Sequence, residues 1–288
     1  MPWDVENIIV DNKPLATTGG RVWDAARQCA QFLSQSGMYH EIMSRPGARL
    51  LELGAGCGWL GLAIANNVAK DKAELVCLTE RAEGGGLAHL ERNLLLNSRS
   101  SRSNLVTAEL DWVQVTKDTE EEVQLRVRRS TNNSTDQGTA FVDTDQVVDR
   151  WDFIFGSDLV YEEKAGVVAL SRLLGRLLRV DTPAATQSPS SSSSPRPIAL
   201  YAHTKRRFEL LDMLFYRELA RQGLRVTEVM CEGQKRPTSP PPMLERLEMG
   251  WDPNFPDMRV VMLEITAAHD GEEVTPYDFH ALQNVGIV

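Results

Sequence analysis

The segment that most constrains this chain is the run Leu50-Leu51-Glu52-Leu53-Gly54-Ala55-Gly56-Cys57-Gly58-Trp59-Leu60-Gly61. An apolar stretch leads into three glycines at alternate positions, and a second apolar stretch follows. This pattern predicts a strand, a tight turn and a helix, whose backbone a nucleoside or amino-acid group can approach because glycine has no side chain. An ordinary strand–turn–helix connection or a dinucleotide-binding fold would use a related pattern. The loop therefore predicts the local fold and leaves the ligand open.

The charge balance and the apolar pattern exclude two kinds of partner. The 31 Lys and Arg residues are outnumbered by 40 Asp and Glu residues, which gives a net charge of -9. An acidic chain lacks the positive charge that neutralises phosphates, so we expect no nucleic-acid partner, whereas a basic partner would suit it. No apolar run approaches the ~20 residues of a membrane span, and no signal peptide is apparent. We therefore expect no membrane association and a location in the cytoplasm, with the nucleus also open.

The cysteines and histidines show no spacing typical of metal ligands. None of the four cysteines forms a Cys-x-x-Cys pair, and the five histidines are scattered along the chain. We therefore expect neither a zinc site nor a disulfide framework, and we assign no metal.

Apolar periodicity predicts strands that alternate with helices along most of the chain. The expected strands are residues 49–53, 74–79, 105–110, 152–156 and 198–203, and the expected helices are residues 22–37, 60–69, 87–97, 166–180 and 207–222. A final antiparallel pair is expected from residues 225–231 and 258–266. Strands and helices in alternation imply an α/β fold with a doubly wound, mostly parallel sheet.

We expect a single domain over residues 1–288, because the α/β pattern resumes after each interruption. Residues 1–45 make up its N-terminal segment and first helix. Residues 116–149 are rich in charged residues, Ser, Thr and Asn, and residues 181–197 are rich in Ser and Pro. Neither stretch can bury enough apolar surface to offset its chain entropy, so both are interpreted as loop insertions, partly disordered.

Polar and aromatic residues follow the expected strands at the ends where open α/β sheets bind ligands. Glu80 could accept hydrogen bonds from ribose hydroxyls, although it could also be a solvated acid. Trp112 could stack on an adenine or cap the core, and Asp111 could accept a bond from the adenine amine. Asp158 and Tyr161 would emerge at the mouth of the crevice. Alternatively, Asp158 is a helix N-cap and Tyr161 packs beside it.

Five segments of the chain occur together, in the same order and with similar spacing, in one known family. They are Gly20-Arg21-Val22-Trp23-Asp24-Ala25-Ala26, Glu52-Leu53-Gly54-Ala55-Gly56-Cys57-Gly58, Thr79-Glu80-Arg81, Leu110-Asp111-Trp112 and Gly156-Ser157-Asp158-Leu159-Val160-Tyr161. On these segments the chain resembles the seven-β-strand protein-lysine methyltransferases of lysine methyltransferase family 16. The glycine motif is generic to S-adenosylmethionine enzymes, whereas the Val-Trp-Asp-Ala-Ala segment together with the Asp-x-x-Tyr motif is more specific.

The resemblance implies a Rossmann-like methyltransferase sheet of seven strands with an antiparallel C-terminal strand, and S-adenosyl-L-methionine as the cofactor. Trp23 would pack against the cofactor, Glu80 would hold its ribose and Trp112 would lie along its adenine. The residues that would border its amino-acid portion are Gly54, Ala55, Gly56 and Ser157. The chain departs from the family in having Glu80 where Asp is more usual, and the insertion at residues 116–149 has no counterpart.

The same resemblance implies that Asp158 and Tyr161 are catalytic residues that face the incoming amine. Methyl transfer from a sulfonium needs a neutral amine, and a lysine of pKa ~10.4 costs about 4.6 kcal/mol to deprotonate at pH 7. We expect Asp158 to attract and orient the amine rather than to deprotonate it. Tyr161, or a water that it holds, would shape the channel and relay the proton.

The expected acceptor is a lysine of a protein such as a chaperone, an elongation factor or another ATPase, with histidine as a further candidate. A nucleic-acid base methyltransferase would carry an Asn/Asp-Pro-Pro-Tyr/Phe motif where this chain has Ser157-Asp158-Leu159-Val160. A nicotinamide dehydrogenase is disfavoured because the Gly-x-Gly-x-x-Gly spacing is absent. A small-molecule N-methyltransferase and a non-catalytic methyltransferase-like binding module stay open as alternatives.

Overall fold

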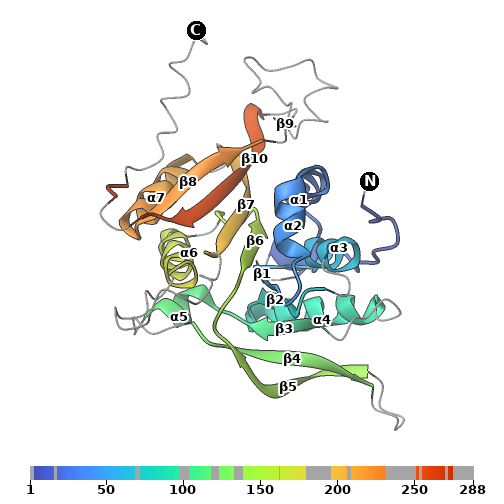
Figure 1. Cartoon of the computed structure of the whole chain (residues 1–288). Coiled ribbons are helices and arrows are strands. Elements are labelled where there is room, and N and C mark those ends of the chain that lie inside the picture. Colours follow the sequence, from blue (N-terminus) through green and yellow to red (C-terminus); the bar gives the residue numbers. More distant parts are fainter. Residues whose placement is uncertain are drawn as a thin grey trace, which may run out of the picture.

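The chain folds around one twisted sheet with helices on both faces (Figure 1). The computed structural model describes residues 3–15, 18–68, 72–97, 104–117, 123–132, 139–161, 163–179, 196–205, 209–230, 251–252, 255–269 and 272–274. Within these residues the sheet has ten strands, in the spatial order β5-β4-β3-β2-β1-β6-β7-β10-β8, and β9 pairs with β10. This is the mostly parallel, doubly wound α/β arrangement that the sequence predicts.

Five parallel strands form the centre of the sheet: β3 (Leu105–Glu109), β2 (Leu75–Glu80), β1 (Arg49–Leu53), β6 (Phe153–Ser157) and β7 (Ile198–Lys205). The next strand, β10 (Phe255–Ala267), is antiparallel both to β7 and to the outermost β8 (Leu224–Val229). The short β9 (Trp251–Asp252) pairs with β10. The expected seven-stranded core with its antiparallel C-terminal strand is therefore present.

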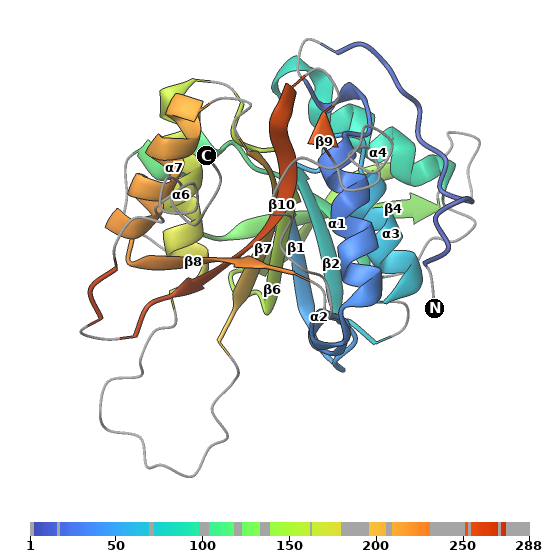
Figure 2. The same cartoon turned by 90° about the horizontal axis from the view of Figure 1, so that it is seen from above.

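Two hydrophobic clusters, one on each face of the sheet, hold the helices in place. In the central strand β1, Leu50 belongs to one cluster and Leu51 to the other, and both are fully buried. Successive strand residues point to opposite faces, which explains why a strand covered on both sides is an unbroken apolar run. Figure 2 shows α1, α3 and α4 on one side of the sheet and α6 and α7 on the other.

The helices are divided between the two faces of the sheet. The first face holds α1 (Asp24–Gln35), α2 (Gly37–Met43), α3 (Trp59–Asn67) and α4 (Gly86–Leu96). The other face holds α5 (Trp112–Lys117), α6 (Lys164–Leu177) and α7 (Glu209–Arg221). Short 3-10 turns occur at Thr18–Gly20 and Glu83–Gly85. The short helices α2 and α5 were not expected from the sequence.

The interpretation of residues 116–149 as a loop insertion is wrong for most of its length. Residues 125–132 and 139–148 form an antiparallel hairpin, β4 (Leu125–Asn132) and β5 (Thr139–Val148), which extends the sheet beyond β3. Val123, Leu125 and Val127 are buried at alternate positions. The residues between them are polar, so the average composition of the segment concealed a one-sided strand pattern.

Two further expectations concern the stretch at residues 181–197 and membrane-spanning helices. The Ser/Pro-rich stretch at residues 181–197 lies outside the described residues except for Arg196 and Pro197. Among the helices that the structure describes, none has the length and apolar character needed to span a membrane.

An N-terminal strap, residues 3–15, is hydrogen-bonded to the C-terminal part of α4 before the chain enters α1. The amide of Ile9 donates to Asn97 Oδ1 at 3.0 Å, and the amide of Asp11 donates to Asn93 Oδ1 at 2.9 Å. Asn93 is fully buried, and its side-chain nitrogen donates to the Cys57 carbonyl at 3.0 Å. The strap is thereby connected through α4 to the glycine loop.

Candidate active site

The glycine loop turns sharply between β1 and α3. Gly54 has φ 57°, and a Cβ there would lie 2.8 Å from Leu159 Cδ2 and 3.2 Å from Trp112 Cζ2. Gly56 has φ 56° and faces the Gly19 backbone at a similarly short distance. A side chain at Gly54 would therefore fill the space between the loop and the segments that follow β3 and β6.

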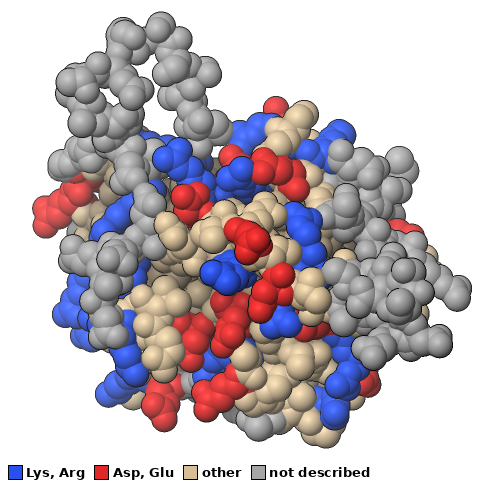
Figure 3. Space-filling model, turned by 90° about the horizontal axis from the view of Figure 1, so that it is seen from below, with Lys and Arg blue, Asp and Glu red and all other residues tan. Residues whose placement is uncertain are grey.

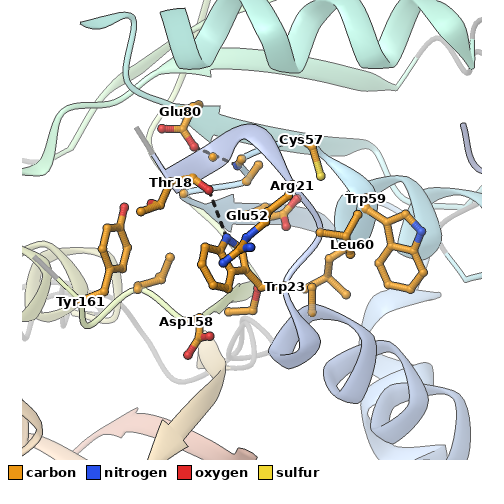
Figure 4. A pocket seen from close by; sticks show the side chains of 18 residues that line it. Thr18, Arg21, Trp23, Glu52, Cys57, Trp59, Leu60, Glu80, Asp158 and Tyr161 are labelled. Carbon is orange, nitrogen blue, oxygen red and sulfur yellow. Dashed lines mark hydrogen bonds between the residues drawn. The ribbon is translucent and has the colours of Figure 1, made fainter. Parts of the chain in front are cut away.

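A cavity of about 160 Å³ lies at the carboxyl ends of β1, β2 and β6. Figure 4 shows Glu80 on one side of this cavity, Asp158 on the other, and Trp23 between them. A second hollow of about 40 Å³ adjoins it and shares Gly54, Glu80 and Tyr161 with it.

The structure brings all nine of the sequence-predicted site residues to these two hollows. The first is lined by Trp23, Gly54, Ala55, Gly56, Glu80, Ser157, Asp158 and Tyr161, and the second by Trp112. The roles assigned to these residues stay predictions, whereas their common location is a finding.

The Glu80 carboxylate is oriented by backbone amides. Its Oε2 accepts a hydrogen bond from the Gly56 amide at 2.8 Å, and its Oε1 accepts one from the Arg81 amide at 3.0 Å. The acid at the end of β2 is thus tied to the glycine loop, and it faces both hollows at once. This position suits a carboxylate that receives hydroxyl groups from a ligand spanning the two hollows.

Trp23 forms one wall of the larger cavity, just before α1 begins. Its indole nitrogen donates to the Thr18 carbonyl at 3.1 Å, and the guanidinium carbon of Arg21 lies 3.9 Å from the centre of its ring (Figure 4). A cation over an indole face is an attractive arrangement. Sequence reasoning assigned no role to Arg21 or Thr18, because neither stands at the end of a strand.

Glu52 is a third residue of the cavity wall that was assigned no role from the sequence. Its side chain lies near the end of β1 and is 3% exposed. Burial raises the pKa of the Glu52 carboxyl well above its usual range and the nearby charge of Glu80 raises it further, while the Gly61 amide acts in the opposite direction. The acidic residue in the Leu-Glu-Leu-Gly run was the available signal.

Asp158 has φ 53°, and it is the only non-glycine residue with a positive φ among those that the structure describes. The alternative that Asp158 is a helix N-cap is wrong, because α6 begins at Lys164 and Glu163 occupies the N-cap position. Strained backbone of this kind costs about 1–3 kcal/mol and is concentrated at functional sites.

Asp111 has a structural task. Its Oδ1 accepts hydrogen bonds from the amides of Val113 at 2.9 Å and Gln114 at 3.1 Å, so it caps α5. The cap fixes the start of the helix on which Trp112 lies, and thereby positions the indole beside Gly54. Within the described part of the chain, no group of three or more His, Cys, Asp or Glu residues could hold a metal ion.

The two hollows fit an elongated ligand with a flat base at one end and an amino acid at the other. Gly54 borders both hollows and lies against Trp112, which offers a flat wall in the smaller one, while Ala55 and Gly56 of the loop border the larger one. Trp112, Glu80 and the Gly54–Gly56 loop would hold the adenine, ribose and amino-acid portions of S-adenosylmethionine. Together with the strand order, these features define an S-adenosylmethionine-dependent methyltransferase with a Rossmann-like fold.

Sequence comparison supports one family within this class over part of the chain. Residues 3–127 match the model of a family described as lysine methyltransferase, which confirms the resemblance to lysine methyltransferase family 16. The matched region contains Trp23, the glycine loop, Glu80 and Trp112, and it ends before Asp158 and Tyr161.

The chain is also similar, at low identity, to solved methyltransferase structures. A methyltransferase from Pyrococcus furiosus is 15% identical, with 90% of this chain and 89% of that chain covered and a TM-score of 0.43. An arsenic(III) S-adenosylmethionine methyltransferase from Chlamydomonas reinhardtii is 14% identical, with 86% and 75% covered and a TM-score of 0.41. No curated protein matches the chain.

Proposed function

We propose that the chain is a protein-lysine N-methyltransferase in which Asp158 and Tyr161 receive the acceptor amine. The observation that carries this proposal is the position of Asp158. It is held in a strained conformation on the cavity wall, away from the Glu80 side where the ribose would lie. The description of the matched family as lysine methyltransferase supports the same acceptor.

The residues around the cavity have to align an amine and limit its contact with water. S-adenosylmethionine, when bound, supplies a methyl group that is already activated for transfer to a nucleophile. An aspartate attracts an ammonium group and stabilises its charged form, so Asp158 contributes orientation rather than deprotonation. Tyr161 borders both hollows. In this proposal its phenol shapes the amine's path and passes on the proton.

The proposed partner is a folded protein with a lysine in a basic setting, of the chaperone, elongation-factor or ATPase kind. The net charge of -9 favours such a partner. Acidic and basic side chains are intermixed on the face seen in Figure 3. On this face, attraction would therefore come from the overall charge and from acids near the cavity.

The test is transfer of radioactive methyl groups from labelled S-adenosylmethionine in a lysate of cells that lack this protein. We expect the purified protein to label a discrete protein band, and hydrolysis of that band to release methyl-lysine. Methyl-histidine in the band would replace lysine as the acceptor. Label confined to the small-molecule fraction, or no label at all, would overturn the proposal.

A further inference from the structure

The turn that presents Asp158 is fastened to the neighbouring strand β7 by three consecutive backbone amides. The Asp158 amide donates to the Ala202 carbonyl at 2.9 Å. The next two amides, of Leu159 and Val160, both donate to the phenolic oxygen of Tyr201, at 2.9 Å and 3.1 Å. One side-chain oxygen therefore satisfies two buried amides directly after the strained residue.

Tyr201 is in turn held by a buried polar chain. Its oxygen lies 3.3 Å from Nδ1 of His203, and Nε2 of His203 lies 3.3 Å from Oδ1 of Asp212 on α7. These three side chains are at most 4% exposed. The Tyr201 oxygen already accepts two hydrogen bonds, so its own proton is available to His203 Nδ1. On the other side of the ring, Nε2 lies close to Asp212 Oδ1 without a hydrogen bond between them.

Burial raises the pKa of the Tyr201 phenol well above its usual range. The negative charges of Asp158 and Asp212 act in the same direction, and the hydrogen bonds from the Val160 and Leu159 amides act in the opposite direction. The phenol therefore keeps its proton throughout the physiological range. The Tyr201 ring also packs edge-on against Phe215, with ring centroids 5.5 Å apart. Both ends of the side chain are thus fixed.

We propose that Tyr201, supported by His203 and Asp212, is the positioning residue that holds the turn at residues 158–160 in its strained form. A strained residue persists only where its surroundings determine its conformation, and buried amides without partners would be costly. Tyr201 thereby sets where the Asp158 carboxylate and the Tyr161 phenol stand. This inference rests on the proposed function, in which those two groups receive the amine.

The test is Tyr201→Phe, which removes one oxygen atom, beside Tyr216→Phe as the matched control. Tyr216 lies in the same aromatic cluster, 2% exposed, with its ring 5.9 Å from that of His203. For Tyr201→Phe we expect faster hydrogen exchange of the Leu159 and Val160 amides by NMR. We also expect an initial labelling rate at least tenfold lower at saturating S-adenosylmethionine. The calorimetric Kd for S-adenosylhomocysteine should change less than threefold.

The control should leave all three readouts near wild type. A Tyr201→Phe protein that keeps the wild-type labelling rate, or that loses no more than Tyr216→Phe, overturns the proposal. Unchanged exchange of the two amides overturns it as well. If Tyr201→Phe shows faster amide exchange and a lower labelling rate while Asp158→Asn is fully active, the positioning role of Tyr201 is supported. The role proposed for Asp158 is then wrong.

His203→Gln serves if Tyr201→Phe does not fold. The glutamine amide can replace Nε2 toward Asp212 and cannot replace Nδ1 toward Tyr201, so the buried acid keeps its partner while the phenol loses its acceptor. We expect the labelling rate to fall at least threefold with the same change in amide exchange. A wild-type rate with wild-type exchange would overturn the proposal.

Discussion

Asp158 combines a position on the cavity wall with a backbone conformation that few residues other than glycine adopt. Asparagine tolerates this left-handed region nearly as well as aspartate, whereas alanine does not. The charge of the side chain and the strain of the backbone can therefore be tested separately, which makes this residue a sharp probe of the proposed acceptor site.

We predict that Asp158→Asn lowers kcat for the protein acceptor by about 100-fold, because a misaligned nucleophile can cost that much. The Kd for S-adenosylhomocysteine should stay within threefold of wild type, and the melting temperature should change little. Asp145→Ala, on the exposed part of β5, is the control for loss of one acidic charge. Full turnover by Asp158→Asn would show that the charge of Asp158 plays no part in methyl transfer.

For Glu52 we predict an effect on the pH dependence of protein stability. Its folded-state pKa is raised above the ordinary value of 4.5, so the folded protein binds more protons there than the unfolded chain does. Its contribution to stability is therefore fully present below pH 4.5 and is lost as pH rises through the folded-state pKa.

Glu52→Gln, without ligand, should therefore gain stability relative to wild type between pH 5 and pH 8. The gain should be about 1 kcal/mol or more, since one pKa unit corresponds to about 1.4 kcal/mol. Thermal unfolding at the two pH values measures it, with the exposed Glu41→Gln as the control. A difference that does not vary with pH would show that Glu52 titrates normally.

At the scale of elements, the β1–α3 turn and the β4–β5 hairpin make separable contributions. The turn places Gly54 at the border of the two hollows. The hairpin pairs with β3 and adds buried apolar residues to the core. Both can be tested with pairs of substitutions that differ in one respect.

We predict that Gly54→Ala weakens binding of S-adenosylhomocysteine more than tenfold, because the added methyl group would displace Leu159 and Trp112 at a residue that borders both hollows. Gly47 is the matched control, since it has φ 77° and no atom within 4 Å of the place that a Cβ would take. Both variants should lose about 1–2 kcal/mol of stability from backbone strain. Equal binding by the two, measured by calorimetry, would mean that ligand does not pass Gly54.

The hairpin should contribute to the core mainly through the face that holds Val127, although Phe141 packs against the cluster on the opposite face. Val127 is fully buried, whereas Val147 on the partner strand is 48% exposed. We expect Val127→Ala to lower the free energy of unfolding by about 1–3 kcal/mol and Val147→Ala to change it by less than about 0.5 kcal/mol. Denaturant titrations of both variants test this, and equal losses would mean that the hairpin does not pack as described.

At the scale of the whole molecule, the net charge of -9 should assist the encounter with a basic acceptor. Salt shortens the range of this attraction from about 10 Å at 0.1 M to about 3 Å at 1 M. We therefore predict that KM for a lysine peptide flanked by basic residues rises severalfold over this range, while the Kd for S-adenosylhomocysteine changes little. A salt-independent KM would show that recognition is local.

The parallel core and the members of the site were predictable because each leaves a local trace in the sequence. Strands covered on both faces appear as apolar runs, and residues of the cavity wall stand at or directly after their ends, as Glu80 and Asp158 do. The hairpin was missed because its one-sided alternation is diluted by charged residues. The Tyr201 anchor was missed because its partners are distant in sequence, and the strain at Asp158 depends on those same distant contacts.

The β4–β5 hairpin also bears on solubility. It pairs with β3, whose edge would otherwise be available to the strands of another molecule. The end of the described sheet is instead β5, which carries Asp143 and Asp145. Charged residues on an edge strand discourage edge-to-edge pairing with a strand of another molecule. A shortened version without the hairpin would therefore be prone to self-association, even though every residue of the cavity would remain.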